Sequence, residues 1–304
     1  LHNDDLVASL YEHLFGTFKV YNMVHQEFDK LFEIKRVDVD QMTYVLDMSS
    51  LIMLFELQQR FSLVYQKKFI VPQGVVQMVN AALIKEQNGT PSFISQHVGE
   101  LLTEIGQPEG EHWMVTRLRT LITWIEQYAE VEVATEILNV DDKGAFSRSE
   151  YIALFYESVM LATRGGRVVL TMDQNLVRMM VALVPMMDVN AYLCHFFRSE
   201  YTDICRFFMQ ANIFGGEIDT QFAFSEYNKF AVGQQSLFKN CQENLTVSPV
   251  SYTQVIDLCF EISRRAVLLD IDLRMIESLF YDLFALFDHH YAGIVLRLIL
   301  AKTQ

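Results

Sequence analysis

The chain has 304 residues, of which 51% are hydrophobic, and its formal net charge is −14 at pH 7. Its 23 Phe and 13 Tyr exclude a disordered chain, because disordered segments are poor in aromatic residues. The negative charge argues against binding to extended duplex DNA, which requires a basic face. No apolar run approaches the roughly 20 residues that a membrane-spanning helix needs, so we expect no interaction with a membrane.

The first part of the chain, residues 1–40, is predicted to be a helical lead-in. Hydrophobic residues recur there at spacings of three and four up to about residue 36, a period typical of an amphipathic helix. Gly16 is a candidate break that divides this helix into two.

Residues 41–190 alternate between short β-branched runs and longer helical patterns. Such alternation predicts a parallel sheet with helices on both faces, which is an α/β fold of three layers. The strands are expected at 44–46, 69–72, 131–134, 168–170 and 184–187. The helices are expected at about 51–65, 73–85, 93–105, 113–128, 149–163 and 175–183.

The remaining residues, 191–304, are predicted to form an all-α region. Four stretches dense in Phe and Leu have helical character, at 190–211, 221–239, 251–269 and 271–301. The chain's four cysteines lie among these patterns without C-x-x-C spacing. We interpret them as reduced buried thiols, which are typical of a cytoplasmic protein. They are Cys194, Cys205, Cys241 and Cys259.

Two of the predicted strands run directly into acidic residues. Asp47 follows the strand at 44–46, and Asp173 follows the strand at 168–170. Ligands bind at the C-terminal ends of strands in open α/β sheets, and carboxylates there are suitable ligands for Mg²⁺ or Mn²⁺. The alternative is that each acid only caps the helix that follows it.

Several short motifs in residues 41–190 together resemble the PIN domain, a family similar to the 5′-nuclease fold. The resemblance depends on their order and spacing, since each motif alone is weak. The motifs are Asp47 with Ser49, Ile70-Val71-Pro72 opening a helix, Glu157 to Ala162 before Gly165-Gly166, and Leu170-Thr171-Met172-Asp173-Gln174-Asn175-Leu176.

The resemblance implies a twisted parallel sheet with helices on both sides and a metal-dependent cleavage of RNA. Asp47 matches the family's first-strand acid, and Asp173 matches the acid of its T-x-D-x-x-L motif. The helix acid is either Glu157, which fits the local pattern, or Glu150, which opens the helix; seven residues separate them, so they share a helix face.

Three further positions are implied to surround these ligands. Ser49 matches the small polar residue two positions after the first acid, and Thr171 precedes the second acid in its motif. Both are expected to orient ligands or phosphate. The third position departs from the family, because Gln77 stands where a helix Glu is usual and is a poor Mg²⁺ ligand.

The leading hypothesis is therefore a ribonuclease of PIN type that uses Mg²⁺ or Mn²⁺ to activate water against single-stranded RNA. The alternative is a catalytically degenerate PIN-like scaffold for a protein partner or a homodimer, which Gln77 and the large helical region favour. A third hypothesis is a regulatory module of a longer protein. Convergence of the acids favours the enzyme, whereas Arg or Lys within their pocket favours the scaffold.

Two other motifs in the chain resemble known functional sequences. Residues 139–150 resemble an EF-hand calcium loop, but Lys143 occupies a ligand position, so a capped turn is favoured. Asp288-His289-His290 resembles a phosphoesterase triplet, but it lies in a predicted helix far from any strand.

Overall fold

The computed structural model describes residues 6–16, 19–21, 39–66, 68–88, 113–135, 150–173, 177, 184–216 and 220–247. The chain divides into two compact units, Leu1–Ile204 and Cys205–Gln304. Among the described residues, no helix combines the length and the apolar character needed to cross a membrane.

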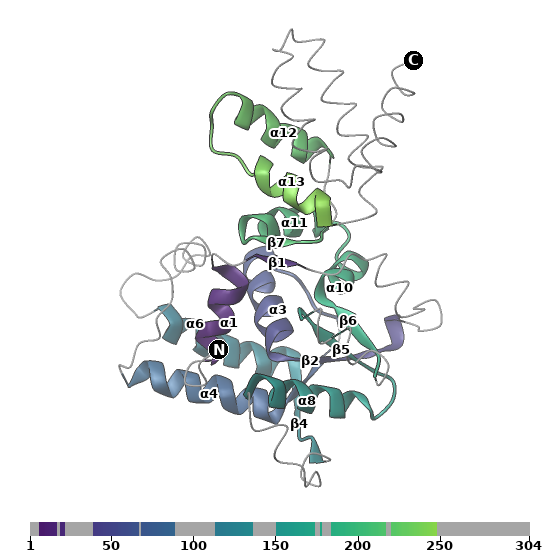
Figure 1. The fold of residues 1–304 in the computed structure, drawn as a ribbon. Coiled ribbons are helices and arrows are strands. Elements are labelled where there is room, and N and C mark those ends of the chain that lie inside the picture. Colours follow the sequence, from purple (N-terminus) through teal and green to yellow (C-terminus); the bar gives the residue numbers. More distant parts are fainter. Residues whose placement is uncertain are drawn as a thin grey trace. The chain divides into compact units, whose positions relative to one another are not determined.

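A five-stranded sheet forms the centre of the first unit (Figure 1). Its strand order is β4-β3-β2-β5-β6, and all four neighbouring pairs are parallel. The predicted α/β fold with a parallel sheet is thus confirmed. The strands are β2 (Thr43–Leu46), β3 (Phe69–Pro72), β4 (Ala129–Glu132), β5 (Arg167–Thr171) and β6 (Met186–Asp188).

Helices cover both faces of this sheet, as the strand–helix alternation predicts. In Figure 1, α3 and α10 lie on one side of the sheet and α8 lies on the other. From β2 the chain adds β3 and β4 on one side, and then β5 and β6 on the other. Right-handed connections in these two directions place helices on opposite faces of the sheet. The helices of this unit are α1 (Leu6–Phe15), α3 (Met48–Phe61), α4 (Gln73–Gln87), α6 (Trp113–Tyr128), α8 (Glu150–Ala162), α10 (Val189–Phe196) and α11 (Tyr201–Gln210), which crosses into the second unit.

The central strands are buried on both faces, which explains their continuous apolar sequences. Val45, Leu46, Val169 and Leu170 are each fully buried, and β2 and β5 pair residue for residue, with Val45 opposite Val169. Buried parallel strands read as apolar runs because helices cover both faces. For this reason the sequence located β2 and β5 well.

A buried ion pair joins three helices on the sheet domain. Arg117 of α6 donates through Nε and Nη2 to the two carboxylate oxygens of Glu56 of α3, with 2.7 Å between Arg117 Nε and Glu56 Oε1. Tyr11 of α1 donates its hydroxyl proton to the same carboxylate over 2.9 Å. All three residues are buried. The charges compensate each other inside the core, so α1, α3 and α6 are fixed together by polar as well as apolar contacts.

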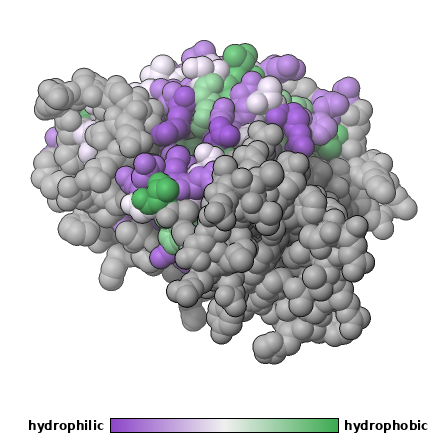
Figure 2. Space-filling view, turned by 90° about the horizontal axis from the view of Figure 1, so that it is seen from above, coloured by the Kyte–Doolittle hydropathy of each residue, from purple (hydrophilic) through white to green (hydrophobic). Residues whose placement is uncertain are grey.

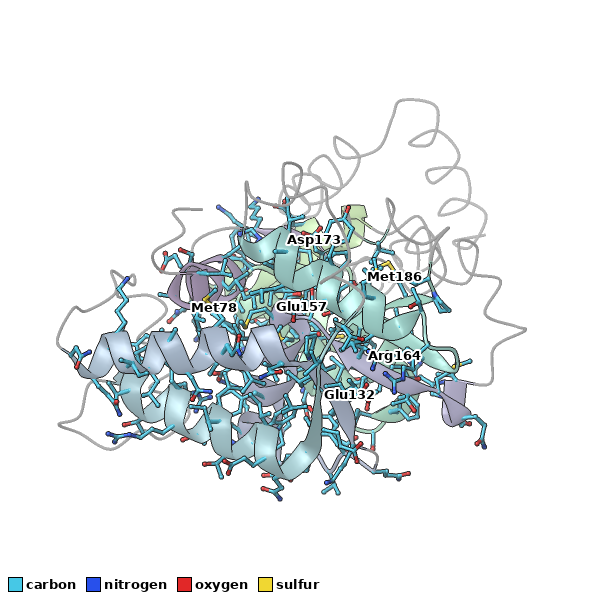
Figure 3. All side chains as sticks on the ribbon, turned by 90° about the horizontal axis from the view of Figure 1, so that it is seen from below. Met78, Glu132, Glu157, Arg164, Asp173 and Met186 are labelled. Carbon is cyan, nitrogen blue, oxygen red and sulfur yellow. The ribbon has the colours of Figure 1, made fainter. Side chains whose placement is uncertain are left out.

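The edge strand β4 begins two residues earlier than predicted. Residues 131–134 were expected to form it, but β4 pairs with β3 from Ala129 opposite Phe69 and ends at Glu132. Glu132 is held there by Arg164 and Arg167, with 2.7 Å between Arg164 Nη1 and Glu132 Oε2 (Figure 3). The alternating valines that suggested a strand at 131–134 are Val131 and Val133, and both are exposed, so they do not mark the buried side of β4.

The predicted helical lead-in is only partly right. The first helix, α1, ends at Phe15 just before Gly16, and a two-residue strand, β1 (Val20–Tyr21), follows where a continued helix was expected. A short 3-10 turn at Val39–Gln41 precedes β2. Residues 22–38 lie outside the described part, as does the helix predicted at 93–105.

The prediction of an all-α C-terminal region is also corrected. The helix expected at 190–211 is broken into α10 and α11, and the strand β7 (Ile213–Phe214) follows. The helices α12 (Thr220–Ala231) and α13 (Phe238–Val247) come next. Asn212 adopts a positive φ of 57°, which turns the chain out of α11 and ends its helical pattern. The helices predicted at 251–269 and 271–301 lie outside the described residues.

The described surface carries single exposed hydrophobic side chains, among them Val64 and Ile84. Figure 2 shows hydrophobic residues interspersed with hydrophilic ones on one face. Isolated exposed hydrophobic residues are normal on protein surfaces, so they point to no site of their own.

Candidate functional site

The candidate site lies where the strand order of the sheet reverses. The chain passes from β2 to β3 and β4 on one side of β2, and β5 and β6 lie on its other side. Neighbouring crossovers leave in opposite directions at such a switch point, which opens a crevice beyond the C-terminal ends of the two central strands. Asp47 follows β2 and Asp173 follows β5, so the two sequence-predicted acids lie at this edge.

Asp47 is the N-cap residue of α3. Its backbone is extended, and its carboxylate accepts a hydrogen bond from the backbone N–H of Ser50, with 2.8 Å between Ser50 N and Asp47 Oδ1. A side-chain oxygen in this position satisfies one of the free N–H groups of the first helical turn. The capping interpretation of Asp47 is therefore correct, but it does not account for the remaining contacts of the carboxylate.

Two hydroxyl groups complete the surroundings of Asp47. Ser49 Oγ lies 2.9 Å from Asp47 Oδ1 and 3.0 Å from Oδ2, and Thr171 Oγ1 lies 2.6 Å from Oδ2. Each hydroxyl then accepts a backbone N–H from the segment after β5, Ser49 from Met172 and Thr171 from Asp173. The two residues predicted to orient ligands are thus brought against the first acid, and they tie β2 to β5.

The carboxylate of Asp47 is buried without a cation. Only 1% of the residue is exposed, and its hydrogen-bond donors in the described chain are Ser49, Ser50 and Thr171, all neutral. Burial raises the pKa of Asp47 from its ordinary value of 3.8, and the hydrogen bonds from Thr171, Ser50 and Ser49 oppose this rise only in part. Burial of an ionised carboxylate without a positively charged partner is energetically unfavourable.

Asp173 and Tyr151 lie at the same edge. Asp173 is half-buried directly after β5, and Tyr151 comes from the first turn of α8. Burial raises the pKa of Tyr151, and the nearby carboxylates of Asp47 and Asp173 raise it further. Tyr151 was not identified from the sequence, where it is one of several aromatic residues in a helical pattern.

Glu157 has a partner of its own. Its carboxylate accepts the backbone N–H of Gly74 over 3.0 Å, at the N-terminus of α4, where Pro72 provides no side-chain cap. A β-carbon at position 74 would lie 2.5 Å from either carboxylate oxygen, so glycine is what allows this approach. The negative charge suits the positive end of the helix dipole. Figure 3 shows Glu157 on α8 and Asp173 after β5.

A three-carboxylate metal site stays a prediction. In the described ranges, no group of three or more His, Cys, Asp or Glu side chains is placed to hold one ion. Glu150 begins α8, but its side chain lies outside what the structure describes. Gln77 is exposed on α4, one turn after Gly74. The EF-hand-like segment before Glu150 and the triplet at 288–290 also lie outside the described residues.

A third strand-end acid, Asp188, was missed in the sequence. It ends β6 opposite Thr171, is fully buried, and caps α10 by accepting the backbone N–H of Asn190 over 2.7 Å. The pattern of Asp47 recurs here, with an apolar run that leads into an acid and then a helix. The strand expected at 184–187 ends directly before Asp188, as the strand expected at 44–46 ends directly before Asp47, so the same signal was present in the sequence.

Comparison with known proteins identifies no relative of this chain. The chain matches no protein-family model, no curated protein and no solved structure.

Proposed function

We propose that the chain is a divalent-metal-dependent ribonuclease of the PIN type, with Asp47 and Asp173 as its metal ligands. The observation that supports this most strongly is the buried carboxylate of Asp47 at the switch point, held by neutral donors and by no Lys or Arg of the described chain. An Arg or Lys partner there would have favoured the scaffold hypothesis instead.

The residues at this edge fit a hard cation in chemical type. Asp47 and Asp173 offer carboxylate oxygens, and Ser49 and Thr171 offer hydroxyl oxygens. Such all-oxygen sets favour Mg²⁺ or Mn²⁺ over softer metals. When bound, the cation would supply Lewis-acid stabilisation of the phosphate and lower the pKa of water.

The protein's own contribution is to hold the ligands in place. Thr171 and Ser49 fix the rotamer of Asp47 from two directions, and both are anchored by the backbone after β5. Hydrogen-bonded ligands lose less freedom on binding a metal, which raises affinity. Asp173 is half-buried and is therefore the more accessible of the two acids.

The test is cleavage of a labelled single-stranded RNA by the full chain in Mn²⁺. The wild type is expected to cleave, and Asp173→Asn is expected to reduce cleavage to background because it removes one ligand charge. Glu130→Gln is the matched control, since Glu130 is exposed on β4. Equal cleavage by the wild type and Asp173→Asn would contradict the proposal.

The second candidate is a degenerate scaffold, and one observation favours it. Both oxygens of Asp47 already accept protein hydrogen bonds, and Glu157 is engaged by Gly74. A scaffold of this kind binds a protein partner or a second copy and needs no cation. Size-exclusion chromatography and RNA cleavage assays separate the two, because a scaffold self-associates or binds its partner without cleaving RNA.

A further inference from the structure

The helix α4 lies along the outside of the sheet domain and has one face without charge (Figure 1). Only Val75, Val79 and Glu86 of its 15 residues are buried, and their spacing places them on one side of the helix. The opposite side is exposed at positions three and four residues apart, which line up in a single stripe. This uncharged stripe consists of Gln73, Gln77, Asn80, Ala81, Ile84 and Gln87.

The lack of charge distinguishes this stripe from an ordinary solvated surface. Charged residues make up 20% of the chain, and the neighbouring helix α6 exposes Arg119 and Glu126. The two charged residues of α4 lie off the stripe, since Glu86 is buried and Lys85 is half-buried. Within the stripe, Ile84 is 58% exposed. The cores of protein interfaces are depleted in charged residues, so the stripe has the composition of a contact surface.

The composition of the stripe fits a second copy of this chain. Residues near a two-fold axis meet their own counterparts, so a charged residue there would meet a like charge. Amide groups both donate and accept hydrogen bonds, and Ala81 and Ile84 are apolar, so the stripe can face itself without repulsion. Asn80 Nδ2 donates to Val76 O of its own helix over 2.9 Å and keeps its second N–H and its oxygen for such a contact.

The net charge of the chain favours the same face. Two copies that each carry −14 repel one another, and this repulsion is smallest where the meeting surfaces add no negative charge. A strongly charged partner would find no opposite charge on the stripe. A second copy is therefore the partner that the stripe suits.

We propose that α4 is the contact surface of a homodimer, in which two α4 helices pack antiparallel about a two-fold axis between Asn80 and Ala81. The axis passes through the middle of the stripe, so Asn80 of each copy faces Ala81 of the other, and Gln77 faces Ile84. A helix of 15 residues is about 22 Å long. The contact is thus at the small end of protein interfaces, and the dimer dissociates on dilution.

This arrangement also gives a reason for Gln77. The resemblance to the PIN domain implies Glu at this position, and a glutamate would place a negative charge beside the axis on both copies. Gln77 keeps the length of glutamate without its charge. Dimerisation through α4 requires neither metal nor RNA, so it is compatible with the nuclease and with the scaffold hypothesis.

The experiment measures the mass of the full chain by sedimentation equilibrium at concentrations from about 1 to about 200 μM. The wild type is expected to rise from 35.3 kDa toward twice this mass. Ala81→Glu and Ala81→Lys place like charges at the axis, and each is expected to raise the dissociation constant at least about tenfold. Glu and Lys are good helix formers, so α4 is preserved. Thr123→Glu, at an exposed position of α6, is the matched control and should dimerise like the wild type.

An equal mixture of Ala81→Glu and Ala81→Lys provides the sharpest comparison. Opposite charges then meet at the axis, so the mixture should dimerise more tightly than either variant alone. A dimer of Ala81→Glu as tight as that of the wild type would overturn the proposal, and so would a mixture no tighter than its two components.

A wild type that stays monomeric over this concentration range also overturns the proposal. The urea-unfolding free energy of Ile84→Glu then shows what covers the stripe. A loss of stability would show that the chain's own residues cover Ile84, whereas unchanged stability would show that the stripe is bare in the isolated chain. Neither measurement involves RNA or metal, so a failure of the dimer is observed separately from a failure of the proposed nuclease.

Discussion

Thr171 donates its hydroxyl proton to Asp47, and the 2.6 Å between Thr171 Oγ1 and Asp47 Oδ2 is the shortest hydrogen bond of this carboxylate. The two residues are 124 positions apart in the chain and meet because β2 and β5 are parallel neighbours, with Leu46 opposite Leu170. The same hydroxyl accepts the backbone N–H of Asp173, so the two acids of the candidate site are linked through one side chain.

Removal of this hydroxyl is expected to destabilise the fold. Thr171→Val keeps the shape of the side chain but removes the shortest hydrogen bond of the buried Asp47 carboxylate and the side-chain acceptor of the Asp173 N–H. The cost is expected to be about 1–3 kcal/mol of unfolding free energy, measured by urea denaturation. Thr123→Val is the control, because Thr123 is exposed and bonds only within α6. Equal stability of the two variants would contradict the buried role of Thr171.

The pH dependence of stability reports on the charge of Asp47. Burial raises the pKa of Asp47 above 3.8, so the folded protein binds this proton more tightly than the unfolded chain does. The resulting stabilisation is fully present below the unfolded-state pKa and is lost as the pH rises through the folded-state pKa.

Relative to Asp47→Asn, the unfolding free energy of the wild type should therefore fall as the pH increases above 3.8. Urea denaturation of both proteins in EDTA, over a series of pH values, measures this difference. A wild type that gains stability over the variant with rising pH would show that the folded state favours the charged carboxylate.

The contact between Gly74 and Glu157 predicts that Gly74→Ala lowers the unfolding free energy of the wild type but raises that of a variant without Glu157. Gly74→Ala displaces the Glu157 carboxylate and breaks its hydrogen bond, with an expected cost of about 1 kcal/mol. In the background of Glu157→Ala no carboxylate is displaced, and the same substitution should stabilise α4 by about 0.5–1 kcal/mol, because Ala is the better helix former. Thermal or urea unfolding of the four proteins measures both values. The same sign in both backgrounds would rule out this capping role of Glu157.

The buried pair of Glu56 and Arg117 predicts that removing Arg117 alone costs more unfolding free energy than removing both charges. Arg117→Met leaves the buried carboxylate of Glu56 uncompensated and should cost about 3–5 kcal/mol of unfolding free energy. Combining it with Glu56→Leu should recover most of that loss, because no buried charge remains. Arg119→Met, at an exposed position of the same helix, serves as the control. A double variant as unstable as Arg117→Met alone would point to lost packing instead.

Much of the sheet could be predicted from its sequence, for a physical reason. β2 and β5 are buried on both faces, so their apolar runs end sharply at the polar residues that follow. β4 and β6 lie at the edges of the sheet, where one side has no neighbouring strand, and their boundaries were misplaced by one or two residues. Asp188 was missed at one of these boundaries.

The candidate site was predictable only in part. The acids and hydroxyls after β2 and β5 were found, because these two strands fix their place. Tyr151 and the partner of Glu157 were not, since both depend on how α8 crosses the sheet edge, and no local pattern encodes that crossing. The ion pair of Arg117 with Glu56 was also not predicted. These residues are 61 positions apart, and no local pattern shows that α6 packs against α3.

The most direct test of the account is Mn²⁺ binding to the full chain, measured by calorimetry on the wild type, Asp47→Asn and Asp203→Asn, an exposed acid on α11. With a metal site at Asp47, the wild type and Asp203→Asn are expected to bind Mn²⁺ equally, and Asp47→Asn is expected to lose binding. No binding to the wild type at millimolar Mn²⁺, or equal binding by all three proteins, would contradict a metal site at Asp47 and leave the scaffold hypothesis in its place.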